Sequence, residues 1–351
     1  MMEPGHDSHS SGGDDFDASV ALRDMIMGFR KTQMIYTAAR LGIADLLEDG
    51  PRSAPDLAGD TRTDPRSLYR LLRALSGLGV FAETPDGRFE LAPPAELLRS
   101  GSPGSMRGMA LLFGDGWMWQ AYGEMFYSVS TGLTAFERVH GQSFYEYQEL
   151  HPAAAAVFDG AMTSFSGLES TAVLKEYDFS GLGNIVDVGG GRGALLAAIL
   201  NAASGARGIV FDRPELADGA AELMRRAGLA NRCDFVGGDF FEGIPDGGDA
   251  YIMKSVLHNW DDDSCHSILG NCREAMGPDS RLLVVERVVP DGAGPSEAKL
   301  FDVNMLVTTG GLERTEREYA ELFERTGFEL ARIIPTNSPV SVVEGLPREP
   351  A

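Results

Sequence analysis

The sequence predicts a two-domain protein, in which a helical N-terminal domain precedes an α/β domain built on a parallel sheet. The chain has 351 residues, a length that suits two domains better than one. Up to about residue 98, apolar residues recur at helical spacing. The second half instead alternates short apolar runs with helical stretches. This alternation is typical of parallel strands with helices on both faces of the sheet.

The N-terminal region has the order helix, turn, helix, hairpin, which is a winged-helix pattern. Ser53 and Asp56 are spaced as a capping pair at a helix start. Asp64–Pro65 suits the first turn of the next helix, which Gly79 can end. Two short apolar runs then flank Asp86–Gly87, a dipeptide that favours a hairpin turn.

A winged helix raises the question of DNA binding. The second helix of the pattern carries four arginines, namely Arg62, Arg66, Arg70 and Arg73. They suit either phosphate contacts or a solvated helix face. The formal net charge of −22 repels phosphate backbones, so we expect no nucleic acid partner.

Composition indicates an ordinary globular protein, with 43% hydrophobic and 23% charged residues. Its three cysteines, an odd number in so long a chain, favour a reducing, cytoplasmic location. No apolar run approaches the roughly 20 residues of a membrane span, and the first residues lack the features of a secretory signal. Asp261–Asp263 suits a helix start, and Cys265, His266 and Cys272 lack a second ligand pair, so no metal is expected.

These patterns divide the chain into four segments. Residues 1–17 are acidic and rich in small polar residues, which predicts a disordered tail. Residues 18–100 hold the winged-helix pattern, and residues 101–178 form a helical, aromatic-rich linking region. Residues 179–351 contain the alternating strands and helices.

A glycine-rich loop follows the first strand of the α/β domain. It lets a ligand approach backbone amides without meeting a Cβ. Gly189, Gly191 and Ala194 match the spacing of dinucleotide-binding loops, and Asp212 at the end of the second strand would bind a ribose. The loop alone therefore leaves the type of nucleotide open.

Three further features favour a nucleoside that carries a cationic amino-acid group. Asp187 puts a carboxylate just before the loop, where an ammonium is better placed than a pyrophosphate. Asp239 and Phe240 end the third strand, where a carboxylate accepts from an adenine amino group and an aromatic ring packs on the base. No arrangement for hydride transfer follows downstream.

Six segments, in this order and spacing, resemble the small-molecule O-methyltransferases of plant caffeate and bacterial antibiotic and phenazine pathways. They are VDVGGGRG, VFDRP, GGDFFEGIP, KSVLHNWDDD, VVERVVP and GGLERT. The similarity runs from about Ala18 to the C-terminus. It implies a Rossmann-like methyltransferase domain that binds S-adenosylmethionine, behind an all-α winged-helix dimerisation domain, and hence a homodimer.

The resemblance also implies the cofactor contacts. Matching motif by motif, they are Gly189, Asp212, Asp239, Phe240 and Lys254, with Trp260 close to the adenine; Asp187 and Gly191 complete the expected cofactor set. For Asp212 and Asp239 the alternative is a strand-end carboxylate that caps the next helix. For Lys254 it is a solvated strand end.

A general base is expected just beyond the fourth strand, where His258 lies. Glu286 ends the fifth strand, and neighbouring strands bring their ends close enough for an acidic residue to orient the imidazole. A phenol has a pKa of about 10 and is mostly neutral at pH 7, so a base that removes its proton speeds transfer. The resemblance implies that His258 is this base and that Glu286 and Glu313 flank it. The alternative is a histidine that caps the following helix.

The acceptor is expected to be a small aromatic molecule with a hydroxyl group. The resemblance places Phe158, Met162, Asn304 and Met305 near the reacting centre. We expect other aromatic residues of the linking region to be core, among them Phe113, Trp117, Trp119, Phe126, Phe144, Tyr145 and Phe165.

Two other functions share parts of this pattern. A nicotinamide-dependent oxidoreductase would use the same glycine loop and Asp212. A winged helix fused to a sensor domain without turnover would make a regulator. Within methyl transfer, the residues leave open which hydroxyl is modified, and whether nitrogen or carbon replaces oxygen as the acceptor.

Overall fold

The computed structural model describes residues 11–102 and 104–348 and divides into two compact units, one ending at Gly116 and the other beginning at Trp117. The division lies later than the expected boundary at residue 100, so the linking region is shared between the units. The expected disordered tail falls partly on residues 1–10, outside the described residues. Its remainder, residues 11–17, lies within the first helix, which therefore starts earlier than the sequence predicted.

The first unit combines helices with a small three-stranded sheet of order β1-β3-β2. Its elements are α1 (Ser11–Ile26), α2 (Gly28–Arg40), α3 (Ile43–Leu46), β1 (Arg52–Ser53), α4 (Ala54–Thr61), α5 (Pro65–Gly77), β2 (Phe81–Glu83), β3 (Arg88–Leu91), α6 (Pro93–Glu96) and α7 (Arg107–Gly114). The hairpin β2–β3 is the predicted one, and β1 adds a strand that the sequence did not predict. The unit is thus mainly helical, with the predicted hairpin extended by β1, which pairs with the free edge of β3.

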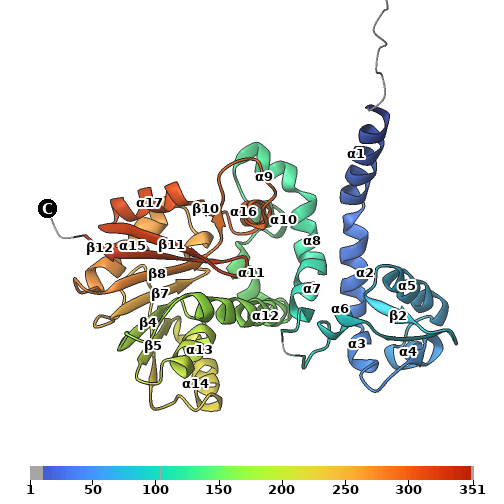
Figure 1. Ribbon diagram of the computed structural model, residues 1–351, viewed down its shortest axis with the longest axis horizontal. Helices are drawn as coiled ribbons and strands as arrows, with labels where there is room; N and C mark the ends of the chain where they lie inside the picture. The colour runs from blue at the N-terminus through green and yellow to red at the C-terminus, as the bar shows by residue number, and fades with distance from the viewer. Residues whose placement is uncertain (1–10, 103, 349–351) are drawn as a thin grey trace, which may run out of the picture. The chain divides into compact units, whose positions relative to one another are not determined.

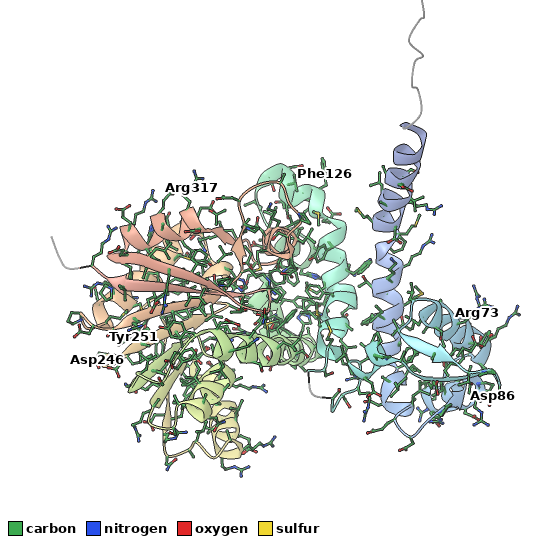
Figure 2. The ribbon with its side chains drawn as sticks, viewed as in Figure 1. Arg73, Asp86, Phe126, Asp246, Tyr251 and Arg317 are labelled. Carbon is green, nitrogen blue, oxygen red and sulfur yellow. The ribbon has the colours of Figure 1, made fainter. Side chains whose placement is uncertain are left out.

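Local signals set the ends of these elements. Ser53 Oγ accepts from the backbone NH of Asp56 at 3.3 Å at the start of α4. Asp64 caps α5 by accepting from the NH of Ser67 at 2.8 Å. Gly79 and Gly87 both have φ of 75°, which confirms the helix end and the turn. Arg62 ends α4 and does not lie on the second helix as predicted, whereas Arg66, Arg70 and Arg73 lie on α5. All four are exposed, and Arg73 lies at the surface of the unit (Figure 2).

The second unit begins with helices and continues with alternating strands and helices. Its elements are α8 (Gly116–Gly123), α9 (Met125–Thr131), α10 (Ala135–His140), α11 (Phe144–Leu150), α12 (Pro152–Glu176), β4 (Asn184–Val188), α13 (Ala194–Ala202), β5 (Arg207–Asp212), the short 3-10 helix η1 (Pro214–Leu216), α14 (Ala217–Arg226), β6 (Cys233–Gly237), β7 (Ala250–Lys254), η2 (Leu257–Asn259), α15 (Asp262–Ala275), β8 (Arg281–Glu286), β9 (Val288–Val289), α16 (Glu297–Thr308), β10 (Arg314–Thr315), α17 (Glu316–Arg325), β11 (Phe328–Pro335) and β12 (Ser341–Pro347).

The central sheet has seven strands in the order β11-β12-β8-β7-β4-β5-β6. Strands β4 to β8 are parallel, as the sequence predicted. The two closing strands were also predicted, but β12 runs antiparallel to both β8 and β11, so the sheet is mixed. The physical reason is the short connection from Pro335 to Ser341, which suits a hairpin and is too short for a crossover.

Alternate residues of the strands pack into two separate hydrophobic cores, one on each face of the sheet. The unit is therefore a three-layer sandwich of helices, sheet and helices. Ile185, Val210 and Ile252 face one layer, where they pack with α12, α13 and α14. Val186 and Met253 face the opposite layer with α15 and α17. Figure 1 shows α13 and α14 on one side of the sheet and α15 and α17 on the other. In the part of the chain that the structure describes, no helix is long and apolar enough to cross a membrane.

Candidate active site

The glycine loop joins β4 to α13 at the carboxyl edge of the sheet. Gly189, Gly191 and Gly193 have φ of 67°, 60° and 80°, a region that favours glycine. Steric limits add to this requirement. A Cβ on Gly190 would lie 2.6 Å from the carboxylate of Asp187, and one on Gly189 would lie 2.7 Å from Val256. The loop therefore keeps a backbone surface that side chains would fill.

Asp187 lies beneath this loop and is almost fully buried, at 1% exposure. Among the described residues, its Oδ2 atom has no hydrogen-bond partner. Burial, together with the nearby charge of Asp212 and against the opposing effect of Lys254, raises the pKa of the Asp187 carboxyl to about 7. A buried carboxylate oxygen without a partner is costly, so this geometry suits a cationic group supplied by a ligand.

Asp212 and Asp239 both bond to the backbone, but neither caps the next helix as the alternative to cofactor binding required: η1 after Asp212 has no side-chain cap, and Asp239 is followed by a turn. Asp212 Oδ2 accepts from the NH of Gly191 at 2.7 Å, and its Oδ1 accepts from the NH of Arg213. Asp239 is exposed, and its Oδ1 accepts from the NH of Phe241 at 2.9 Å. Each carboxylate oxygen accepts more than one hydrogen bond, so these contacts hold the loops and leave capacity for a ligand.

Two of the expected aromatic residues lie together at the same edge. The rings of Phe240 and Trp260 are 6.1 Å apart at an angle of 79°, and both side chains are half-buried. Phe241 completes the group, 4.9 Å from Trp260. An exposed aromatic edge beside Asp239 suits a flat heterocycle.

Lys254 is not a solvated strand end. Its Nζ lies 2.8 Å from Glu169 Oε2 and donates to Ser166 Oγ at 3.1 Å. Glu169 on α12 is 3% exposed and lies 3.8 Å from the buried Arg287. Glu169 and Arg287 were not predicted as site residues, because contacts between distant segments, such as Lys254 with Glu169 across 85 positions, leave no local pattern in the sequence.

His258 lies in the turn η2, directly after β7, and is 7% exposed. Its Nδ1 is 2.8 Å from Glu313 Oε1, in a buried hydrogen-bonded pair. A carboxylate only accepts hydrogen bonds, so Nδ1 carries the proton and donates to Glu313. This tautomer leaves the lone pair on Nε2, the nitrogen that a general base needs.

Glu286 does not contact the imidazole, which corrects the expected geometry. The two strands are neighbours as predicted, with Lys254 opposite Val285. Glu286 Oε1, however, accepts from the backbone NH groups of Val256 and His258, at 3.0 and 3.2 Å. Its Oε2 accepts from the Tyr319 hydroxyl at 2.7 Å. Glu286 thus holds the backbone of the turn, because the NH groups of Val256 and His258, which follow β7, satisfy its carboxylate before it reaches the ring.

Opposing influences act on the pKa of His258. Burial lowers the pKa of the ring, whereas the hydrogen bond to Glu313 and the charge of Glu286 raise it. The raising effects are larger together, so the pKa of His258 lies above its ordinary value of 6.5. The site therefore makes this imidazole a stronger base than a free histidine.

The four expected acceptor residues lie on α12 and α16. Phe158 and Met162 are half-buried on α12, and the Phe158 ring lies 5.4 Å from that of Phe144. On α16, Asn304 Oδ1 accepts from the Tyr122 hydroxyl at 2.6 Å, and Met305 is 3% exposed, which makes it core. Tyr122 was not predicted, since its helix α8 is distant in sequence.

Two more aromatic residues differ from the prediction: Phe301 beside His258, which was not predicted, and Phe126 on α9. The Phe301 ring lies nearly parallel to that of His258, with centroids 6.2 Å apart. The guanidinium carbon of Arg287 lies 3.9 Å from the centroid of the same Phe301 ring. Phe126 was expected in the core but is 84% exposed on α9 (Figure 2). Its helix has seven residues, of which only Ser128 is buried, so Phe126 points to the surface.

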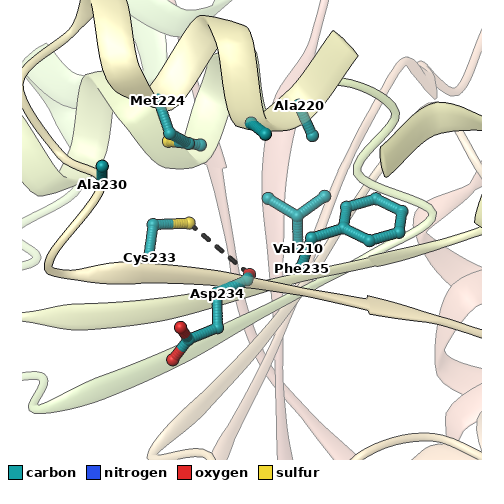
Figure 3. A pocket seen from close by; sticks show the side chains of 8 residues that line it. Val210, Ala220, Met224, Ala230, Cys233, Asp234 and Phe235 are labelled. Atoms are coloured by element: carbon teal, nitrogen blue, oxygen red, sulfur yellow. Dashed lines mark hydrogen bonds between the residues drawn. The ribbon is translucent and has the colours of Figure 1, made fainter. Parts of the chain in front are cut away.

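A separate hollow lies between α14 and strands β5 and β6 (Figure 3). It is lined by Val210, Ala220, Ala221, Met224, Ala230, Cys233, Asp234 and Phe235, and holds about 180 Å³. None of the expected site residues lines it, so it does not correspond to the candidate site. Within the described residues, no group of His, Cys, Asp or Glu side chains is placed to hold a metal ion.

Family models match both units. Residues 119–329 match the O-methyltransferase domain and residues 24–101 match the O-methyltransferase dimerisation domain. The chain belongs to the S-adenosylmethionine-dependent O-methyltransferases. The α/β unit is thus a methyltransferase domain with S-adenosylmethionine as its cofactor, and the family is one of secondary metabolism.

Individual relatives agree with this assignment. The phenazine O-methyltransferase PhzM of Lysobacter antibioticus is 44% identical over 329 residues, covering 94% of this chain and 96% of that protein. The 8-amino-8-demethylriboflavin N,N-dimethyltransferase of Streptomyces davaonensis is 38% identical, covering 89% and 90%.

A solved O-methyltransferase of neocarzinostatin biosynthesis, in complex with S-adenosylmethionine and 2-hydroxy-5-methyl naphthoic acid, is similar with a TM-score of 0.77. It is 33% identical, covering 90% of this chain and 96% of its own. Family membership decides against the oxidoreductase that the glycine loop alone left open. It does not decide the acceptor atom, because one of these relatives methylates nitrogen by name.

Proposed function

We propose that this methyltransferase methylates a hydroxyl oxygen of a small aromatic acceptor, with His258 as the general base. The observation that supports this most directly is the buried pair of His258 Nδ1 and Glu313 Oε1 at 2.8 Å. It fixes the tautomer in which Nε2 accepts a proton, and it raises the pKa of the ring above 6.5. A methyltransferase that acts by proximity alone has no need for such a pair.

The chain's own part in the reaction is to hold the acceptor and to remove its proton. When bound, S-adenosylmethionine supplies a methyl group on a positively charged sulfur. His258 Nε2 takes the proton of the acceptor hydroxyl, and Glu313 stabilises the resulting imidazolium. Glu286 keeps the turn in place through two backbone amides. A positioned base of this kind contributes about 10²–10⁴-fold in rate.

The residues of the loop fit the cofactor. The unpartnered Oδ2 of Asp187 would pair with the ammonium, and the side-chain-free backbone of Gly189 and Gly191 would face the ligand. Asp212 would accept from the ribose hydroxyls, and Asp239 with Phe240 and Trp260 would hold the adenine. Lys254 would favour the ionised form of Asp187 through its nearby positive charge.

The acceptor would lie among Phe158, Met162 and Asn304, with Met305 behind them as packing. Apolar and aromatic side chains suit a flat ring, and the Asn304 amide, oriented by Tyr122, offers a polar group. Hydroxylated phenazines and naphthoates are the acceptor classes that the relatives' names favour.

We further infer a homodimer in the cytoplasm. The dimerisation-domain match supports the first statement. The three free cysteines, Cys233, Cys265 and Cys272, support a reducing compartment.

The decisive experiment compares wild type with His258→Ala on a panel of hydroxylated and amino-substituted naphthoates and phenazines. We expect a product heavier by one methyl group on oxygen, identified by mass spectrometry and NMR. His258→Ala should lose about 100-fold or more in kcat while its Kd for S-adenosylhomocysteine stays the same. His151→Ala, which alters an exposed histidine, serves as the control. Methylation of nitrogen alone, or a wild-type rate in His258→Ala, would overturn the proposal.

A further inference from the structure

The turn that carries His258 has a backbone conformation that needs support. Ser255, just before it, has φ of 55°, which non-glycine residues rarely adopt. Such strain persists only where the surroundings hold it. Asn259 Nδ2 donates to the Ser255 carbonyl at 3.0 Å, and Glu286 accepts from the amides of Val256 and His258. These contacts come from the turn itself and from β8.

Gly311 packs directly against the backbone of this turn. A Cβ added to Gly311 would lie 1.9 Å from the carbonyl oxygen of His258 and 2.6 Å from the carbonyl carbon of Asn259. Real Cβ atoms do not make contacts this short, and the atoms in question are backbone, which cannot rotate away. Any larger residue at this position must therefore displace either the turn or the segment that contains Gly311.

Arg314 holds the same turn with its side chain. The side chain is 1% exposed, so protein atoms replace water as the hydrogen-bond partners of the guanidinium. It donates through Nη1 to the carbonyl of Leu257 at 3.1 Å and through Nη2 to the carbonyl of Trp260 at 3.0 Å. These two carbonyls lie on either side of His258 in the sequence. The same guanidinium also bonds Asp262 at the start of α15, at 2.8 Å. The planar fork of arginine suits several fixed acceptors at once.

We propose that Gly311 and Arg314 are positioning residues that set the place and direction of the His258 imidazole. They belong to residues 310–315, the segment that also supplies Glu313. One short segment thus contacts the turn's backbone through Gly311, its flanking carbonyls through Arg314 and the ring through Glu313. The proposal rests on the function proposed for His258, because these residues act only through it.

The test combines kinetics with a titration of the free protein. Carbon-13 labelling of the histidine Cε1 atoms gives NMR signals, and the His258 signal is identified by its loss in His258→Ala. In Gly311→Ala the turn moves away from Glu313, so the pKa of His258 should fall relative to wild type. We expect kcat to fall about 100-fold, the size of a base's contribution, with KM for S-adenosylmethionine within about twofold.

The matched control is Gly270→Ala on α15, a helix that begins beside the turn. An added Cβ there meets no atom of the described residues within 4 Å. This variant should keep the wild-type pKa of His258 and the wild-type kcat. Arg314→Gln should lower kcat about tenfold, and Arg314→Lys should regain part of that loss because the cation returns.

If Gly311→Ala folds and keeps both the pKa of His258 and kcat, the proposal is wrong. If Gly311→Ala does not fold, the proposal is tested by Arg314→Gln and Arg314→Lys instead. Wild-type kcat and an unchanged pKa of His258 in both Arg314 variants would overturn the proposal. A wild-type rate in His258→Ala is a different result: it removes the role of the base, whereas the NMR titration still reports whether Gly311 positions the ring.

Discussion

At the scale of single residues, the pKa of His258 depends on two opposing effects, burial of the ring and its interaction with nearby carboxylates, chiefly Glu313. Burial alone would lower it, and the carboxylates outweigh that effect. Glu313→Gln keeps a hydrogen-bonding group of similar size but removes the charge, so the pKa of His258 should fall. The acid limb of kcat/KM should move to lower pH, because the base stays neutral at lower pH, and the maximal rate should drop about 100-fold as the base weakens.

The measurement is a pH–rate profile of both proteins with a fixed acceptor. An acid limb at the same pH in Glu313→Gln would mean that another group controls it. Glu297→Gln is a suitable control, since Glu297 is half exposed and pairs with Arg287 instead of His258.

Asp187 gives a second prediction, on cofactor affinity. Its pKa of about 7 means that the free protein holds it largely neutral below pH 7. An ammonium favours the ionised carboxylate, so binding of S-adenosylhomocysteine should release a proton near pH 6. Affinity should therefore rise with pH, by up to about tenfold per unit below pH 7, and then level off.

Calorimetry in two buffers of different ionisation enthalpy measures the released proton directly. Asp187→Asn should bind more weakly, and its affinity should no longer change across this pH range. An affinity that is flat with pH in the wild-type protein would show that Asp187 does not meet the ammonium.

At the scale of elements, the glycine loop offers a steric test. Gly190→Ala introduces a Cβ 2.6 Å from the buried carboxylate of Asp187, which has little room to move. We expect the loop to shift and the Kd for S-adenosylhomocysteine to rise at least about tenfold, while the fold is kept. Gly205→Ala, in the turn after α13, is the control, because no described atom lies within 4 Å of its added Cβ. Equal affinities for the two variants would contradict the role of the loop.

The elements themselves were largely predictable, and their long-range contacts were not. Strand β4 was predicted directly before the glycine-rich loop, where it is observed, because its apolar run lies between polar and glycine-rich segments. The cap at Asp64 was predictable for a similar reason, since capping is local. By contrast, the apolar pattern does not show that β12 lies between β11 and β8 and runs antiparallel to both strands.

The same holds for the site, whose residues were predictable from motifs but whose contacts were not. Motifs placed His258, Glu286 and Glu313 in one region, but only the structure separates their contacts: the ring for Glu313 and the backbone for Glu286. Glu169 left no signal of its own in the sequence, and Arg314 lies in the segment GGLERT without any sign of the carbonyls it bonds. A buried charge is recognised by its partners, and those partners come from distant segments.

At the scale of the whole molecule, the apolar surface of the N-terminal unit has to be explained. Leu22, Met25, Ile26 and Phe29 on α1 and α2 are each more than half exposed. Several large apolar residues in succession at a surface favour a protein interface. Because residues 24–101 match a dimerisation domain, we expect these side chains to be buried against a second copy of the chain.

Introducing carboxylates into this apolar surface tests whether it forms the dimer interface. Met25→Glu with Ile26→Glu would place two carboxylates in an apolar interface, and their desolvation without partners should raise the dimer dissociation constant more than about 100-fold. Light scattering at micromolar concentration should then report monomers where the wild type is dimeric. Leu346→Glu alters an exposed apolar residue of the other unit and should leave the dimer intact. A double variant that stays dimeric would place the interface elsewhere, and α9, where Phe126 and Val129 are also exposed, would be the next surface to alter.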